Sequence, residues 1–191
     1  MANISDVQGT YTFNFKNVKS KTDEEKISWI KELAELMGNV GYNTSFEDAK
    51  RLTPSSIEDN EVTLSFSASG RWAYRNNIAW FEDGWEELTY LVEEMEGIVI
   101  YIDYNEYETG CMFVASGEFT VEVKDNKVLV EQCSLEEDEL NKETFVSWGF
   151  GSANEYDEMF GDDDEWPFLG LSFFIPQKIN KQKNVFLLIL L

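Results

Sequence analysis

The side chains that could do chemistry in this chain are carboxylates, because the sequence contains 37 Asp and Glu residues and no histidine. Without histidine, nucleophile pairs of the Ser-His-Asp and Cys-His kinds are excluded, and so are the commonest zinc sites. The two cysteines, Cys111 and Cys133, form no Cys-x-x-Cys motif. No pair of carboxylates stands out by an apolar neighbourhood that would raise one pKa for acid–base catalysis. We therefore expect a protein that is not an enzyme and that uses no cofactor.

The acidic run Asp162–Glu165 offers oxygen ligands of the kind that Ca²⁺ and Mg²⁺ prefer. It lacks the alternating Asp-x-Asp-x-Asp spacing and the distal Glu of a calcium-binding loop, so a solvated acidic turn explains it better. Gly149-Phe150-Gly151 is not a phosphate-binding loop, because neither a lysine nor a helix signal follows it. The sequence therefore predicts no metal site.

The formal net charge of −22 is concentrated in one part of the chain, since residues 61–170 carry 27 acidic and 5 basic side chains. Such a surface repels nucleic acid and anionic membranes, and it attracts the basic proteins that bind them. One acidic run lies on an expected helix, over residues 82–96, and a second run lies over residues 136–139. Together they predict a surface that binds a basic protein. Its residues are Glu82, Asp83, Glu86, Glu87, Glu93, Glu94, Glu136, Glu137, Asp138 and Glu139. The alternative is that the acidity serves solubility alone.

Two arginines stand among aromatic residues in a stretch that is otherwise poor in basic side chains. Their guanidinium groups could form cation–π contacts with neighbouring rings, which predicts a small recognition patch of Arg71, Trp72, Tyr74 and Arg75. The alternative, which we favour, is that these arginines neutralise nearby carboxylates and fix a junction between a strand and a helix.

Helix signals lie early and in the middle of the chain. Thr22 followed three residues later by Glu25 is typical of a capping box, and it opens a helix over residues 22–37. Over residues 78–96, apolar residues also recur at spacings of three and four residues, with acidic residues on the other face of the expected helix. At Asp83-Gly84 we expect this second helix to break and to be capped again by Asp83 and Glu86.

Alternation of apolar and polar residues predicts the strands. Ile98–Tyr104 is nearly continuous in apolar residues, which is typical of a central strand covered on both faces. Lys124–Lys127 has the composition of a tight hairpin turn, whereas Ser134 with Glu137 resembles a capping box that would open a short acidic helix. The strands are expected over residues 10–15, 62–66, 98–104, 111–115, 118–123 and 128–132, with a bulge at Gly117.

This order of elements predicts an α+β fold, a mainly antiparallel sheet with two main helices on one face, in a ferredoxin-like or related sandwich. We expect one domain over residues 1–147 and an irregular acidic and aromatic extension over 148–175 packed on it. Residues 176–191 form a basic and apolar tail, which is either a read-through extension or a genuine final strand. Because the N-terminus has no signal-peptide pattern and no run nears about 20 apolar residues, we expect a cytoplasmic protein without a membrane span.

The stretch from 62 to 130 combines the strand Val62–Phe66, Gly70-Arg71-Trp72, a helix through Trp85 and Leu88, and Tyr104-x-Glu106-x-Glu108-x-Gly110-x-x-Phe113. In these features it resembles the ferredoxin-like domain of YubB-type proteins of plasmids and phages. The resemblance covers about a third of the chain. It implies a mobile-element origin and a ferredoxin-like sheet, and it implies no activity and no site residues.

Together these features predict a non-enzymatic acidic protein of a phage or mobile element. It would inhibit a nucleic-acid-binding defence enzyme, such as a restriction or CRISPR enzyme, by presenting carboxylates in place of phosphates, without binding nucleic acid itself. An acidic immunity protein against a basic nuclease toxin would have the same physical character. A third reading is an accessory module that binds a peptide or a small ligand. The spatial arrangement of the carboxylates discriminates between these functions: one stripe spaced like phosphates favours mimicry of nucleic acid, and an even scatter favours a role in solubility alone.

Overall fold

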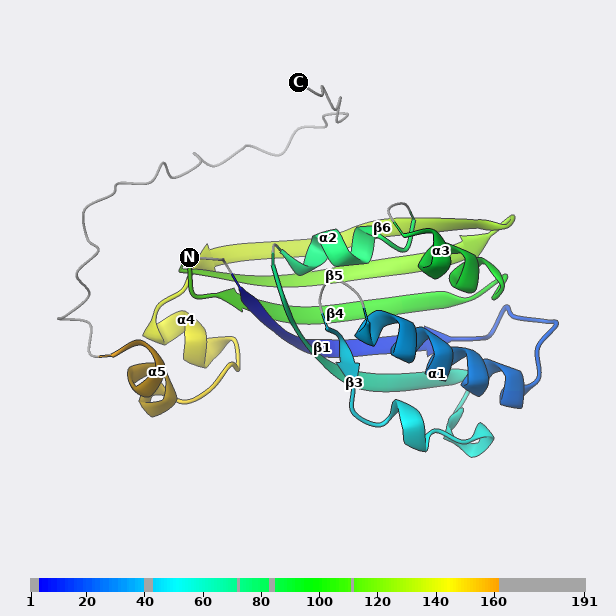
Figure 1. Ribbon diagram of the computed structural model, residues 1–191, viewed down its shortest axis with the longest axis horizontal. Coiled ribbons are helices and arrows are strands. Elements are labelled where there is room, and N and C mark those ends of the chain that lie inside the picture. The colour runs from blue at the N-terminus through cyan, green and yellow to red at the C-terminus, as the bar shows by residue number, and fades with distance from the viewer. Residues whose placement is uncertain (1–3, 40–42, 72, 83–84, 111, 162–191) are drawn as a thin grey trace, which may run out of the picture.

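A six-stranded antiparallel sheet with helices packed against it forms the body of the molecule (Figure 1). The computed structural model describes residues 4–39, 43–71, 73–82, 85–110 and 112–161, and every structural statement below concerns these residues. The strands are β1 (Ser5–Asn14), β2 (Ser45–Phe46), β3 (Glu61–Gly70), β4 (Val99–Glu108), β5 (Phe113–Lys124) and β6 (Lys127–Glu139). The helices are α1 (Asp23–Gly38), α2 (Tyr74–Ala79), α3 (Glu86–Glu93), α4 (Lys142–Ser147) and α5 (Ala153–Phe160), with 3₁₀ turns η1 (Ala49–Arg51) and η2 (Pro54–Ser56).

The α+β class and the antiparallel sheet are confirmed, whereas the ferredoxin-like topology is not shown. The strand order is β2-β3-β1-β4-β5-β6, and each neighbouring pair is antiparallel. In a ferredoxin-like sheet the two strands that flank the first helix are parallel and have another strand between them. Here β1 and β2 flank α1, and β3 lies between them as an antiparallel neighbour of both, but β2 has only two residues and β5 and β6 extend the sheet beyond β4.

The main core lies between the sheet and the layer formed by α1, α2 and α3. The expected alternation holds in the first strand, where Tyr11, Phe13 and Phe15 are all buried. The Tyr11 ring meets Phe46 and Phe66 edge-on, with centroids 5.1 and 5.0 Å apart. Aromatic side chains from three strands therefore fill the centre of the core, where they contribute large buried areas.

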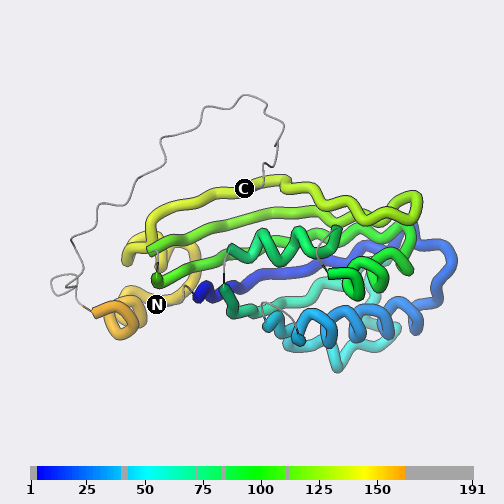
Figure 2. Tube along the Cα trace, turned by 45° about the horizontal axis from the view of Figure 1, so that its top comes forward, coloured from blue at the N-terminus to red at the C-terminus, as the bar shows by residue number. Residues whose placement is uncertain are grey.

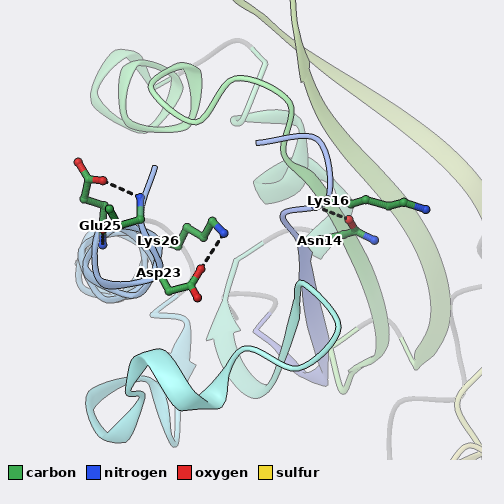
Figure 3. Close-up of polar contacts among 6 residues, drawn as sticks. Asn14, Lys16, Asp23, Glu25 and Lys26 are labelled. Carbon is green, nitrogen blue, oxygen red and sulfur yellow. Dashed lines mark hydrogen bonds and ion pairs between the residues drawn. The ribbon is translucent and has the colours of Figure 1, made fainter. Parts of the chain in front are cut away.

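Helix α1 begins as the sequence predicts. The Thr22 side chain accepts a hydrogen bond from the Glu25 backbone N–H, and the Glu25 carboxylate accepts one from the Thr22 backbone N–H at 2.7 Å. These bonds lower the pKa of the Glu25 carboxyl. One turn on, Lys26 forms an ion pair with Asp23 at 2.8 Å (Figure 3). The two reciprocal hydrogen bonds between Thr22 and Glu25 satisfy backbone N–H groups that the helix itself leaves free.

The prediction that the central strand is covered on both faces is wrong. In β4, Ile100, Ile102 and Tyr104 are buried beneath the helices, but Tyr101 on the opposite face is 47% exposed. The face of the sheet away from α1–α3 is polar over most of its area, with Thr12 and Thr63 hydrogen-bonded across two strands at 2.9 Å. Because Tyr101 is aromatic, the sequence of β4 looked continuously apolar, although its residues alternate between a buried and an exposed face.

The second predicted helix is two helices, as the expected break implied. α2 and α3 are separated near residues 80–85, and Asp83, the expected new cap, lies outside the described residues. Trp85 is the N-cap residue of α3 and is only partly buried, whereas the rest of the apolar stripe lies in the core. That stripe comprises Phe81, Leu88, Leu91, Val92 and Met95.

The segment from Ser134 to Glu139 is strand, so the predicted acidic helix there is wrong. Lys124–Lys127 is the expected tight turn, with positive φ at Asp125 and Asn126, as a type I′ hairpin requires. From it β6 runs on to Glu139 in register with β5. The register shifts between Glu118 and Phe119, where Cys133 of β6 is the extra residue, so the bulge lies on β6 and the expected bulge at Gly117 is wrong. Pairing with β5 outweighs the local capping signal, which the strand backbone does not use.

A second, smaller core joins α4 and α5 to the far end of the sheet (Figure 2). Phe145, Tyr156 and Phe160 pack there with Val114 and the partly buried Tyr107. The extension that we expected to be irregular is therefore helical over Ala153–Phe160, and its aromatic side chains pack on the sheet in this core. The tail from 176 lies outside the described residues. In the described part of the chain, no helix is long and apolar enough to cross a membrane.

Candidate partner-binding surface

Helix α3 presents carboxylates to solvent because its apolar residues are taken up by the core. Leu88, Leu91 and Val92 face inward, and the acidic side chains between them point away. Glu82, Glu86, Glu87 and Glu94 are exposed, and Glu93 is partly buried. Helical periodicity thus places the first predicted acidic group as the sequence suggested, apart from Asp83, which the structure does not describe.

One of these carboxylates, Glu86, interacts with an aromatic side chain of α3. Tyr90, which is 59% exposed, donates its hydroxyl hydrogen to Glu86 Oε1 at 3.0 Å. This bond and the charge of Glu86 raise the pKa of the Tyr90 phenol. The pair lies on the helix surface one turn apart, so an exposed aromatic ring stands within the acidic group.

The second predicted acidic group lies on β6, and strand geometry splits it between two faces. Glu137 and Glu139 pair with Ala115 and Phe113, on the side of the sheet that carries the helices, whereas Glu136 and Asp138 point to the polar face. β6 pairs with β5 alone, so it is an edge strand of the described sheet. Charged side chains on an edge strand oppose pairing with other chains, which is a structural reason for part of this acidity.

The two groups lie along the same side of the molecule. α3 packs against β6 near the hairpin end, and the run 136–139 lies at the opposite end of the strand, beside α4 (Figure 1). We call these two groups together the acidic edge, formed by Glu82, Glu86, Glu87, Glu93, Glu94, Glu136, Glu137, Asp138 and Glu139. Periodicity along the sequence does not show that these residues form two patches at the two ends of β6 rather than one.

The three described residues of the predicted arginine patch have different surroundings in the structure. Tyr74 is wholly buried, its backbone N–H donates to both oxygens of Glu106 at 3.0 and 2.9 Å, and burial raises the pKa of its phenol to about 12. Arg75 forms an ion pair with Glu137, which ties α2 to β6. Arg71 is exposed, and Trp72 lies outside the described residues. Arg75 thus has the neutralising role that the alternative assigned to both arginines.

Other carboxylates have structural roles that the sequence did not reveal. Glu96 accepts hydrogen bonds from the backbone N–H groups of Asp125 and Asn126 at 3.1 and 3.0 Å, so it holds the β5–β6 turn. On the polar face Asp103 lies directly opposite Glu118 on the neighbouring strand. Burial, and then the Glu118 charge, raise the pKa of the Asp103 carboxyl. Nothing in the local sequence of these residues indicates their partners, because the partners are 15 or more positions away.

The chemistry open to the acidic edge is binding. Within the described residues, no group of three or more acidic or cysteine side chains is placed to hold a metal ion. Its carboxylates are exposed and fixed on a helix and a strand, which suits the recognition of a positively charged surface. Comparison with known proteins gives no family to set beside this geometry: no family model, no curated protein and no solved structure matches the chain.

Proposed function

We propose that the acidic edge binds a basic, nucleic-acid-binding protein and occupies the surface on which that protein holds nucleic acid. The protein is then a non-enzymatic inhibitor, and its partner is an enzyme of defence against phages or mobile elements. The observation that carries the proposal is the placement of exposed carboxylates on two rigid elements, α3 and β6, along one side of the sheet.

The charge balance of the chain supports a role beyond solubility. Residues 15–70, which form α1 and β3, carry ten acidic and seven basic side chains. Residues 73–139, which form the acidic edge and the strands beneath it, carry 18 acidic and three basic ones. A charge spread for solubility alone has no reason to favour one part of a single sheet, whereas a surface that steers a basic partner has.

The length of the acidic edge also suits a nucleic-acid site. A strand of 13 residues at about 3.3 Å per residue extends about 40 Å, which is about the rise of one turn of B-form DNA (about 34 Å). Duplex DNA presents one charge per about 1.7 Å of its axis, so the edge imitates part of the phosphate density. Exposed charges of this kind accelerate encounter more than they tighten the final complex.

The test is a capture experiment with the whole chain from a host lysate, followed by competition with duplex DNA. The first variant reverses Glu86, Glu87, Glu93 and Glu94 to Lys. The matched control reverses four carboxylates on the α1 side, Glu24, Glu32, Glu35 and Glu47, which are all exposed. We expect the edge variant to lose the partner, the control to keep it, and duplex DNA to displace wild-type protein.

Two results would count against the proposal. If both variants lose the partner equally, net charge rather than the acidic edge determines binding. If DNA and the protein bind the partner together, the protein does not occupy the nucleic-acid site. The second result, with the edge variant still defective, would favour an immunity protein that binds a nuclease beside its substrate groove.

A further inference from the structure

A cleft of about 340 Å³ opens on the polar face of the sheet, away from α1, α2 and α3. It lies where the ends of β1, β3 and β4 meet the loop between α4 and α5. Its walls include Asp6, Gln8, Ser67, Ser69, Tyr107 and Phe150. None of these residues belongs to the acidic edge, so the cleft is a separate feature of the molecule.

The loop that closes the cleft is held in place by hydrogen bonds from the sheet. The Gln8 side-chain amide donates to the Gly149 carbonyl at 3.1 Å, and the Asn105 amide donates to the Trp148 carbonyl at 3.3 Å. The Phe150 backbone N–H donates to the Phe145 carbonyl, also at 3.1 Å. These bonds fix the Phe150 ring against the sheet, so this wall of the cleft is formed before any ligand binds.

Two aromatic rings and one carboxylate give the cleft its chemistry. The Phe150 ring meets the Tyr107 ring at 4.9 Å between centroids and 65° between planes. Asp6 lines the same cleft as Tyr107, and burial, together with the Asp6 charge, raises the pKa of Tyr107 to about 12. The phenol therefore stays neutral at physiological pH, and Asp6 is the one charged side chain among the described residues of the wall.

We propose that this cleft binds an organic cation, an alkylguanidinium or alkylammonium group. A positive group between Asp6 and an aromatic ring of this pair gains both charge pairing and cation–π attraction. The amide of Gln8 and the hydroxyls of Ser67 and Ser69 can accept its N–H groups. Small-molecule sites range from about 300 to 1,000 Å³, so the cleft suits a small ligand or a single side chain.

The experiment is a nuclear magnetic resonance titration of the whole chain with butylguanidinium and, separately, with butylurea. The two probes have nearly the same shape, but butylurea carries no charge. We expect saturable shifts at Asp6, Gln8 and Tyr107 with butylguanidinium and none with butylurea. This comparison uses wild-type protein, so it does not depend on the folding of a variant.

Two variants then locate the binding. Asp6→Asn should weaken butylguanidinium binding at least tenfold, because it removes the charge and keeps the shape. Glu87→Gln makes the same change in net charge on the acidic edge and should leave binding unchanged. Equal binding of the two probes, equal loss in the two variants, or shifts that do not saturate would each overturn the proposal. None of these outcomes depends on whether the acidic edge binds a partner.

Discussion

The two edges of the sheet, the one beside α1 and the acidic edge along β6, differ in how many of their carboxylates have partners. On the α1 side, carboxylates have nearby partners: Lys26 pairs with Asp23 at 2.8 Å, Arg51 pairs with Asp48 at 3.2 Å, and Asn14 donates to Glu61 at 2.6 Å. On the acidic edge, the one ion pair among the described residues joins Arg75 to Glu137. The same sheet therefore carries one side whose charges are largely balanced and one side whose charges are not.

The unpaired carboxylates of the acidic edge do not contribute favourably to the free energy of unfolding. Both sides bury aliphatic and aromatic side chains in one continuous core, and burial supplies most of the stability. Repulsion among unpaired carboxylates subtracts from it. We therefore expect substitutions in the core to be costly on either side, and removal of the unpaired charges of the acidic edge, which exclude Glu137, to be harmless or stabilising.

The largest effect is expected for Tyr11→Ala in the core beneath α1. Tyr11 is wholly buried, its ring packs on Phe46 and Phe66, and its hydroxyl lies 3.1 Å from that of Tyr74. Loss of a buried aromatic ring costs about 3–5 kcal/mol, and the free energy of unfolding in urea would measure it. Glu87→Ala on the acidic edge is the comparison, and it should change the same quantity by less than about 0.5 kcal/mol.

A smaller effect is expected beneath the acidic edge, at Gly117→Ala. A Cβ atom at Gly117 would lie 2.6 Å from Cε1 of the buried Tyr104 ring. The ring or the strand must move, and overpacking of this kind costs about 1–3 kcal/mol. If Tyr104→Leu restored stability to the Gly117→Ala protein, the clash would be confirmed as the cause. An unchanged melting temperature in the single variant would show that the strands relax freely there.

Loss of the α1 cap should cost less. Thr22→Ala removes the side-chain acceptor of the capping box and should lower the free energy of unfolding by about 1 kcal/mol. Ser28→Ala, at an exposed position within the same helix, should not lower it, because Ala has the higher helix propensity. Equal destabilisation by the two substitutions would contradict the capping role.

The smallest effect concerns Asp103 on the polar face. Its pKa is raised in the folded protein, so the folded state binds more protons than the unfolded state between the ordinary and the raised pKa. Stability is therefore lost as the pH rises through that window. Asp103→Asn should raise the melting temperature at pH 7, and the difference should vanish in acid, below the ordinary pKa of about 3.9. A constant difference at all pH values would exclude titration as its source.

Local signals account for the parts of the fold that the sequence predicts well. The Thr22–Glu25 cap and the 124–127 turn depend on neighbours within four residues, and the structure has both. Ser134 and Glu137 carry the same kind of local signal, but pairing with β5 makes them strand residues. Strand order and register depend on contacts between distant segments, which periodicity does not report.

The candidate sites divide in the same way. The exposed face of α3 follows from helical periodicity, so its carboxylates could be assigned from the sequence. The cleft could not, because Asp6, Tyr107 and Phe150 come from three distant parts of the chain. The burial of Tyr74 could not be predicted from the sequence either, because its contacts with Tyr11 and Glu106 form only when α2 lies on the sheet.

The salt dependence of binding distinguishes a partner that is bound by the acidic edge from one that is bound by the net charge of the whole protein. The Kd of the captured partner would be measured from about 50 to 200 mM salt for wild-type protein, for the edge variant and for the α1-side control, because screening weakens contacts between exposed charges. We expect a steep slope of log Kd against log salt for wild type and control, and a shallow slope with weak binding for the edge variant. Equal slopes for all three proteins would contradict binding by the acidic edge.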